Sequence, residues 1–300
     1  MLGLTILGNN SALPAFERHP TAQVLTFGQH LCLIDCGEGT QCQLSKYKIK
    51  RNRISHIFIS HLHGDHYFGL PGLLTSMSLM GREEPLHVHA PAALQQILEL
   101  QINASGSPLS YPFHFHANMV DGIIVNEPEF TVSAFSVKHK IECWGYLFRE
   151  KKHLRKINNE KAQEHGVPLA QYHLLHRGEN YIALDGSTIL NEWVTYPNTN
   201  PKSYAYCADT IFDESLPEKV AGVDLLYHES TYLEEMTEMA GKRYHSTAYQ
   251  AGVIGQKAQA KQLLIGHFSS KYECIEPFLH QAKKAFDNTH LAIEGVSFRL

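Results

Sequence analysis

The segment 54–74, ISHIFISHLHGDHYFGLPGLL, constrains the fold of this chain more than any other stretch. Its apolar run at 57–59 predicts a buried strand, and apolar residues at helical spacing from Tyr67 onward predict a helix. Gly64, between the two, permits a tight turn. Four side chains that can bind a metal ion lie in this turn within six residues: His61, His63, Asp65 and His66. The segment therefore predicts a strand, a metal-ligand loop and a helix in direct succession.

The size and composition of the chain favour a globular α/β protein. Three hundred residues are enough for one large domain or two small ones. The hydrophobic fraction of 43% and the charged fraction of 19% are typical of soluble domains. A formal net charge of −4 does not favour nucleic-acid binding, so such a role would need a local basic patch. Twenty histidines is a high number and favours metal chemistry.

The cysteines and the N-terminal residues give an expectation for the cellular compartment of the protein. The six cysteines contain no CxxC pair, which favours reduced thiols over a disulfide framework. The first ten residues, MLGLTILGNN, are too short and too uncharged for a signal peptide. No apolar run approaches the ~20 residues that a membrane helix needs. We therefore expect a cytoplasmic protein that does not enter a membrane.

Predicted strands and helices alternate along most of the chain as two βα halves, with an insertion at about 151–201 in the second half. The predicted strands are 1–7, 23–27, 30–34, 57–59, 86–89, 113–116, 130–137, 145–148, 204–207, 225–227, 262–265 and 291–293. The predicted helices are 41–47, 67–74, 92–102, 247–259 and 275–286. Around the insertion, residues 138–177 carry nine Lys and Arg against four Glu, in a chain that is negative overall. As a bare charge run, such a stretch is either a solvated helix face or a nucleic-acid contact.

Three later strands also end in a residue that can bind a metal. His139 follows the strand 130–137, Asp209 follows 204–207, and His267 follows 262–265. Each of these residues alone would more often be an ordinary hydrogen-bonding group. Strand ends at one edge of a sheet gather into a site, so the three can join the ligand loop. Five imidazoles and two carboxylates suit zinc, or another divalent ion such as manganese, and fit two sites that share one carboxylate.

The ligand pattern and its flanking sequences resemble a known family. HxHxDH followed by isolated His, Asp and His residues resembles the metallo-β-lactamase superfamily. The sequences DCGEGTQ at 35–41, CWGY at 143–146, HEST at 228–231, HST at 245–247 and GHFSS at 266–270 narrow this to the short form of ribonuclease Z, the tRNA 3′-processing endonuclease. The resemblance covers nearly the whole chain.

The resemblance implies a fold, a reaction and roles for individual residues. The fold would be one four-layer αββα domain over 1–300, with the insertion at about 151–201 as a tRNA-binding exosite arm. The enzyme would be a homodimer that carries two zinc ions per chain and cleaves the 3′ trailer from precursor tRNA. One metal would be bound by His61, His63 and His139, the other by Asp65, His66 and His267, with Asp209 bridging. Asp65 would also accept the proton of the attacking water, and His245, supported by Glu229, would protonate the leaving 3′ oxygen. The expected products are a tRNA with a 3′-hydroxyl and a trailer with a 5′-phosphate.

The chain also departs from the family pattern. The segment 14–19, which contains Phe16 and His19, lacks the lysine and asparagine of the family's proline–lysine–arginine–asparagine motif, and Ser230 stands where alanine is common. The arm offers Gly166-Val167-Pro168 in place of a glycine–proline stretch. These differences concern substrate docking and the position of the cut.

Other interpretations compete with this one. Asp65 could cap the following helix, Glu229 could be an orienting or helix-capping carboxylate, and the pairs His87/His89 and His114/His116 are expected to be ordinary strand residues. The chain could instead hydrolyse a small phosphodiester or a sulfate ester, or bind tRNA without activity. The basic run 151–161 in the insertion argues against a small-molecule hydrolase, and an intact set of seven ligands argues against a pure binding protein.

Overall fold

The computed structural model describes residues 2–300, and the chain divides into two compact units. The larger unit comprises the chain up to Arg149 together with Lys202–Leu300, and the smaller unit is Glu150–Pro201. Among residues 2–300, no helix combines the length and the apolar character needed to span a bilayer.

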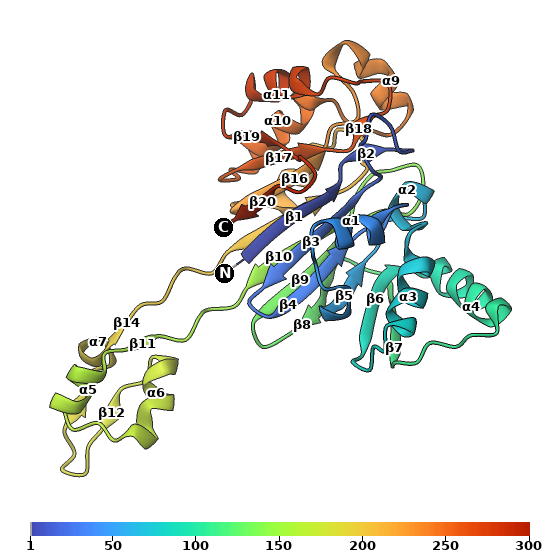
Figure 1. Ribbon diagram of the computed structural model, residues 1–300. Coiled ribbons are helices and arrows are strands. Elements are labelled where there is room, and N and C mark those ends of the chain that lie inside the picture. The colour runs from blue at the N-terminus through green and yellow to red at the C-terminus, as the bar shows by residue number, and fades with distance from the viewer. Residues whose placement is uncertain (1) are drawn as a thin grey trace. The chain divides into compact units, whose positions relative to one another are not determined.

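Two seven-stranded mixed sheets form the centre of the larger unit (Figure 1). The first sheet has the order β20 (Ser297–Arg299), β1 (Leu2–Gly8), β3 (Ala22–Phe27), β4 (His30–Ile34), β5 (Ile54–Phe58), β6 (Leu86–Pro91) and β7 (Phe113–Asn118). The second has the order β19 (Thr289–Leu291), β17 (Leu263–Gly266), β16 (Leu225–Glu229), β15 (Ser203–Cys207), β10 (Trp144–Glu150), β9 (Phe130–Ser136) and β8 (Gly122–Asn126).

Helices cover the outer faces of both sheets, so the larger unit has four layers. One apolar core lies between the sheets and includes Ile34, Phe130 and Tyr206. A second core joins the first sheet to α1 (Thr40–Lys46), α3 (Leu70–Leu79) and α4 (Ala93–Ser105). A third core joins the second sheet to α8 (Leu216–Lys219), α10 (Ala248–Lys257) and α11 (Glu276–Lys283). The predicted αββα sandwich is therefore confirmed.

Most predicted elements are present, and one prediction at the C-terminus is wrong. The predicted strands 23–27 and 30–34 form the antiparallel pair β3–β4, and Gly28 in the turn between them has φ 54°. The prediction for 1–7 corresponds to β1, and Met1 lies outside the described residues. The closing strand was predicted at 291–293, but the observed strand is β19, which covers Thr289–Leu291. The chain then turns at Gly295 (φ 81°) and forms β20, which pairs antiparallel with β1 in the other sheet.

An array of imidazoles lies across β5, β6 and β7. His56 is in register with His87, which is in register with His114, and His89 is in register with His116. Nδ1 of His56 lies 3.2 Å from Nε2 of His89, and Nδ1 of His87 lies 3.0 Å from Nε2 of His116, with interplanar angles of 23° and 20°. Burial lowers the pKa of His56 to about 3 and that of His89 to about 2. These histidines are strand residues, as expected.

The smaller unit has its own small core. It contains the paired strands β11 (Lys156–Ile157) and β14 (Thr195–Tyr196), and β12 (Tyr181–Ile182) and β13 (Thr188–Ile189). Its helices are α5 (Asn159–Glu164), α6 (Tyr172–Arg177) and α7 (Asn191–Val194). Five buried apolar side chains pack between these elements: Ala162, Val167, Leu175, Ile189 and Val194.

Candidate metal centre

The seven predicted ligands converge at one edge of the two sheets. His61 and His63 follow β5, and Asp65 and His66 begin the short helix α2 (Gly64–Tyr67). The other three ligands follow strands of the second sheet: His139 after β9, Asp209 after β15 and His267 after β17. Two groups of ligand atoms, each with all members within 4.8 Å of one another, result: His61, His63, His139 and Asp209 in the first, and Asp65, His66 and His267 in the second.

The imidazole nitrogens of the first group face a common point. Nε2 of His61 and Nδ1 of His63 are 3.0 Å apart, and Nε2 of His139 lies 3.3 Å from the same Nδ1. Their rings meet at 83° and 84°, unlike the nearly parallel rings of the imidazole array. Three imidazole nitrogens this close together can be ligands of one ion.

Asp209 connects the first group to the second. Its Oδ2 lies 3.5 Å from Nε2 of His61, and its Oδ1 lies 3.1 Å from Nε2 of His267 and 3.5 Å from Nε2 of His66. Oδ2 of Asp65 lies 3.4 Å from Nε2 of His267 and 3.5 Å from Nε2 of His66. One carboxylate therefore offers a different oxygen to each group, which is the arrangement of a bridging ligand.

The chemistry of this donor set fits divalent cations. Burial lowers the pKa of His61 well below its usual value, so its imidazole is neutral and can offer a lone pair. Burial acts to raise the pKa of Asp209, but His267 and His66 outweigh it and hold this pKa below its usual range. Oδ1 of Asp209 is buried and has no hydrogen-bond partner among residues 2–300. An unpartnered buried carboxylate oxygen is costly unless a cation occupies the site.

Hydrogen bonds with residues outside the two ligand groups fix the orientation of the ligand side chains. The buried carboxylate of Asp35 accepts from the Ser60 amide at 2.7 Å and its hydroxyl at 2.9 Å, and from the Tyr206 hydroxyl at 2.6 Å. Nδ1 of His66 lies 2.8 Å from the same carboxylate. Nδ1 of His139 donates to the Tyr244 carbonyl at 2.9 Å. Such outer partners set the tautomer of each ligand and hold its free nitrogen toward the position that a metal would occupy.

The half-buried His245 and the buried Glu229 form a pair beside the second ligand group. Nδ1 of His245 lies 2.9 Å from Oε1 of Glu229, and the Glu229 side chain is fully buried. Burial acts against the charge of His245, but the Glu229 carboxylate and its hydrogen bond outweigh burial and raise the pKa of His245 to about 9. Backbone amides of Thr210, Thr231 and Ser246 also donate to Glu229, which keeps it ionised.

The two capping alternatives do not agree with the structure. No side chain caps α2, and Oδ2 of Asp65 accepts instead from the Ala12 amide at 2.7 Å. The first helix after Glu229 that has a side-chain cap is α10. Its cap is formed by Thr247 and Gln250, and not by Glu229. Asp65 and Glu229 therefore make their hydrogen bonds to Ala12 and His245 and do not cap these helices.

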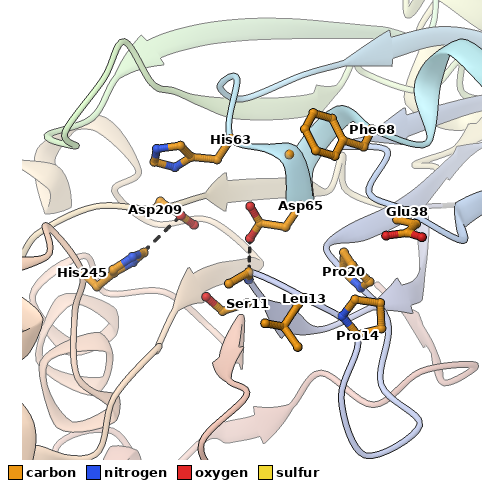
Figure 2. A pocket seen from close by; sticks show the side chains of 12 residues that line it. Ser11, Leu13, Pro14, Pro20, Glu38, His63, Asp65, Phe68, Asp209 and His245 are labelled. Atoms are coloured by element: carbon orange, nitrogen blue, oxygen red, sulfur yellow. Dashed lines mark hydrogen bonds and ion pairs between the residues drawn. The ribbon is translucent and has the colours of Figure 1, made fainter.

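A cavity of about 430 Å³ opens onto the ligands. Figure 2 shows His245 and Asp209 on one side of Asp65, and Phe68 and Glu38 on the other. The cavity gives a substrate access to Asp65, His63 and His245 from solvent.

Sequence reasoning did not assign roles to the outer partners Asp35, Ser60 and Thr231. Asp35 carries one signal that could have found it, because it is a charged residue directly after the buried strand β4. Its backbone has φ 54°, which is uncommon for a residue with a side chain and is often found at functional sites.

Comparison with solved structures defines the class of the protein. The human tRNase Z, short form, aligns with a TM-score of 0.73 and 24% identity, covering 99% of this chain and 98% of that chain. The metallo-β-lactamase fold protein YhfI from Bacillus subtilis aligns with a TM-score of 0.72 and 17% identity, over 99% and 98% of the two chains. The family described as "Anti-Pycsar protein Apyc1" matches residues 2–140. The fold and the His/Asp site thus define a metallo-β-lactamase-fold protein.

Sequence relatives identify the family. Ribonuclease Z of Bacteroides fragilis is 40% identical over 299 residues, which cover 99% of this chain and 98% of that protein. Ribonuclease Z of Porphyromonas gingivalis is 41% identical over 98% of both chains, and that of Cytophaga hutchinsonii is 43% identical over 98% of this chain and 95% of its own. The chain belongs to the ribonuclease Z family, as the sequence motifs predicted.

Proposed function

We propose that this chain is a metal-dependent endoribonuclease that cleaves the 3′ trailer from precursor tRNA, leaving a 3′-hydroxyl on the tRNA and a 5′-phosphate on the trailer. The observation that carries the proposal is the pair of ligand groups joined by Asp209, in a chain of the ribonuclease Z family. Two zinc ions suit the imidazole and carboxylate donors, and manganese is a second candidate. Ions held there would polarise the scissile phosphate and activate the attacking water.

Asp65 and His245 would carry out the two proton transfers of the reaction. Burial acts to raise the pKa of Asp65, but the neighbouring His66 and His267 outweigh it and hold this pKa well below its usual range. Asp65 therefore stays ionised, accepts a hydrogen bond from the attacking water and directs it toward the phosphorus. In this proposal Asp65 also accepts the proton of that water.

His245 is the general acid in this proposal. With a pKa of about 9 it is protonated at neutral pH, and its Nδ1–H is held by Glu229. The proton on Nε2 is therefore the one available to the leaving 3′ oxygen. A cationic imidazole at this position also attracts the phosphate backbone.

The smaller unit is proposed as the tRNA-binding arm. Lys152, Lys156, Lys161 and Arg177 are exposed there, whereas the guanidinium of Arg155 donates to the Thr195 hydroxyl at 2.7 Å. Exposed basic side chains bind phosphates without reading base sequence, which suits recognition of many tRNAs. A homodimer would let the arm of one subunit help to seat tRNA on its partner. Such an enzyme would act in the cytoplasm, where precursor tRNA is processed.

One assay tests the proposal. The purified protein is incubated with a 3′-extended precursor tRNA, with and without a chelator, and the cut is mapped. A single metal-dependent cut at the trailer junction is expected. Turnover of a small chromogenic phosphodiester without any cleavage of precursor tRNA would instead support the small-ester hydrolase.

A further inference from the structure

Thr231 lies between the predicted metal ligand His267 and the Glu229–His245 pair. Its side chain is buried in the loop after β16. The hydroxyl oxygen lies 2.8 Å from Oε2 of Glu229 and 2.9 Å from Nδ1 of His267. Nδ1 of His245 lies 3.2 Å away. One hydroxyl therefore contacts the carboxylate of the acid pair and the far nitrogen of a metal ligand.

The number of available protons fixes the direction of these hydrogen bonds. A threonine hydroxyl has one proton to donate and two lone pairs to accept with. Ionised Glu229 can only accept, so the hydroxyl donates to Glu229. The contact with Nδ1 of His267 then requires the imidazole to donate its Nδ1–H to the hydroxyl. Nε2 of His267 is thereby left with its lone pair, and this nitrogen faces Oδ1 of Asp209 at 3.1 Å.

The backbone around His267 makes this side-chain contact important. His267 has φ 60°, a conformation that residues with a side chain rarely adopt. The loop is held by backbone hydrogen bonds from the Ser230 amide to the Gly266 carbonyl at 2.8 Å and from the Ser269 amide to the Thr231 carbonyl at 3.1 Å. These bonds fix the position of the backbone, while the rotation of the imidazole ring depends on its hydrogen bond to Thr231.

We propose that Thr231 is a positioning residue that holds His267 in its ligand tautomer and orientation, and that links this metal ligand to the Glu229–His245 pair. The inference rests on the proposed function, because it assigns His267 to the metal centre. It predicts that removal of one hydroxyl weakens metal binding at the second ligand group and disturbs the acid pair at the same time.

The test compares Thr231→Val with Thr231→Ser. Valine has nearly the same shape and lacks the hydroxyl, whereas serine keeps it. Thr289→Val is a matched control, because Thr289 is also buried but donates to the Phe286 carbonyl in a different part of the unit. Zinc affinity of each metal-stripped protein is measured by competition with a chromogenic chelator, and cleavage of precursor tRNA is measured in parallel with zinc in excess.

Thr231→Val is expected to bind one of its two zinc ions about 10- to 100-fold more weakly, while Thr231→Ser and Thr289→Val stay within about threefold of the wild type. The kcat of Thr231→Val should fall with KM for precursor tRNA unchanged. Wild-type zinc affinity in Thr231→Val, or equal losses in the valine and serine variants, would overturn the inference. A wild-type protein that binds two zinc ions but does not cut precursor tRNA would refute the proposed function, and the affinities would still decide the role of Thr231.

Discussion

The imidazole array gives a stability prediction that can be worked out from two residues. His56 and His89 are buried, and their pKa values of about 3 and 2 lie far below the value of about 6.5 that they have when the chain unfolds. Burial is the main cause, because a charged imidazole would lose its hydration. Neighbouring imidazoles add a smaller effect of the same sign, His87 on His56 and His56 on His89.

The sign of the pH dependence follows from these values. A histidine whose pKa is depressed in the folded state contributes stability that is fully present above about pH 6.5 and is lost as the pH falls below it, because the unfolded chain binds the proton first. Between pH 7 and pH 5, linkage gives a loss of about 2 kcal/mol for each of the two imidazoles. Together they lower the free energy of unfolding by about 4 kcal/mol over this range.

His89→Gln tests this calculation, because the amide can still hydrogen-bond to His56 but does not titrate. The free energy of unfolding is measured by urea denaturation at pH 7 and at pH 5, with zinc held in excess. The loss between the two pH values should be about 2 kcal/mol smaller in the variant than in the wild type. Any cost of the substitution that does not depend on pH cancels in this comparison.

His280→Gln is the matched control, since His280 is exposed on α11 and lies outside the array. This variant should lose as much stability between pH 7 and pH 5 as the wild type. If His89→Gln also lost as much as the wild type, the array would not bind protons on unfolding and the reasoning would be refuted.

Three further predictions concern the site and the arm. Asp35→Asn should weaken zinc binding about 10- to 100-fold in a chelator competition assay, because the charge that orients His66 is lost; unchanged affinity would contradict this role. Glu229→Gln should lower the pKa of His245 from about 9, so that cleavage measured against pH declines at a lower pH than in the wild type; an unshifted alkaline limb would exclude His245 as the acid. Deletion of 152–195 should weaken precursor tRNA binding in a gel-shift assay and spare hydrolysis of a small chromogenic phosphodiester. Loss of both activities would mean that the larger unit depends on the arm to fold.

The sequence predicted the ligand residues because strand ends carry a pattern that can be counted. Each of the seven side chains follows a short apolar strand or lies in the loop that begins at His61, and strand ends meet at one edge of a sheet. The two capping alternatives could not be excluded at that level. They depend on which backbone amides lie near Asp65 and Glu229, and this is decided by loops that are distant in sequence, such as the one that carries Ala12.

The residues Asp35 and Thr231 and the last strand, β20, could not be predicted, because contacts distant in sequence define them. Asp35 and Thr231 act through hydrogen bonds to histidines 31 and 36 residues away, and such contacts have no period in the sequence. The strand β20 is three residues long and is defined by its pairing with β1 at the other end of the chain. Long-range pairing of this kind overrides the local apolar pattern that favoured 291–293.

Titration of metal into the stripped protein, with precursor tRNA cleavage measured at each step, tests the central claim most directly. The ligand groups joined by Asp209 predict that two zinc ions bind per chain and that cleavage rises as the second ion binds. Full activity with one ion per chain, or cleavage that persists after both ions are removed, would contradict a shared two-metal centre.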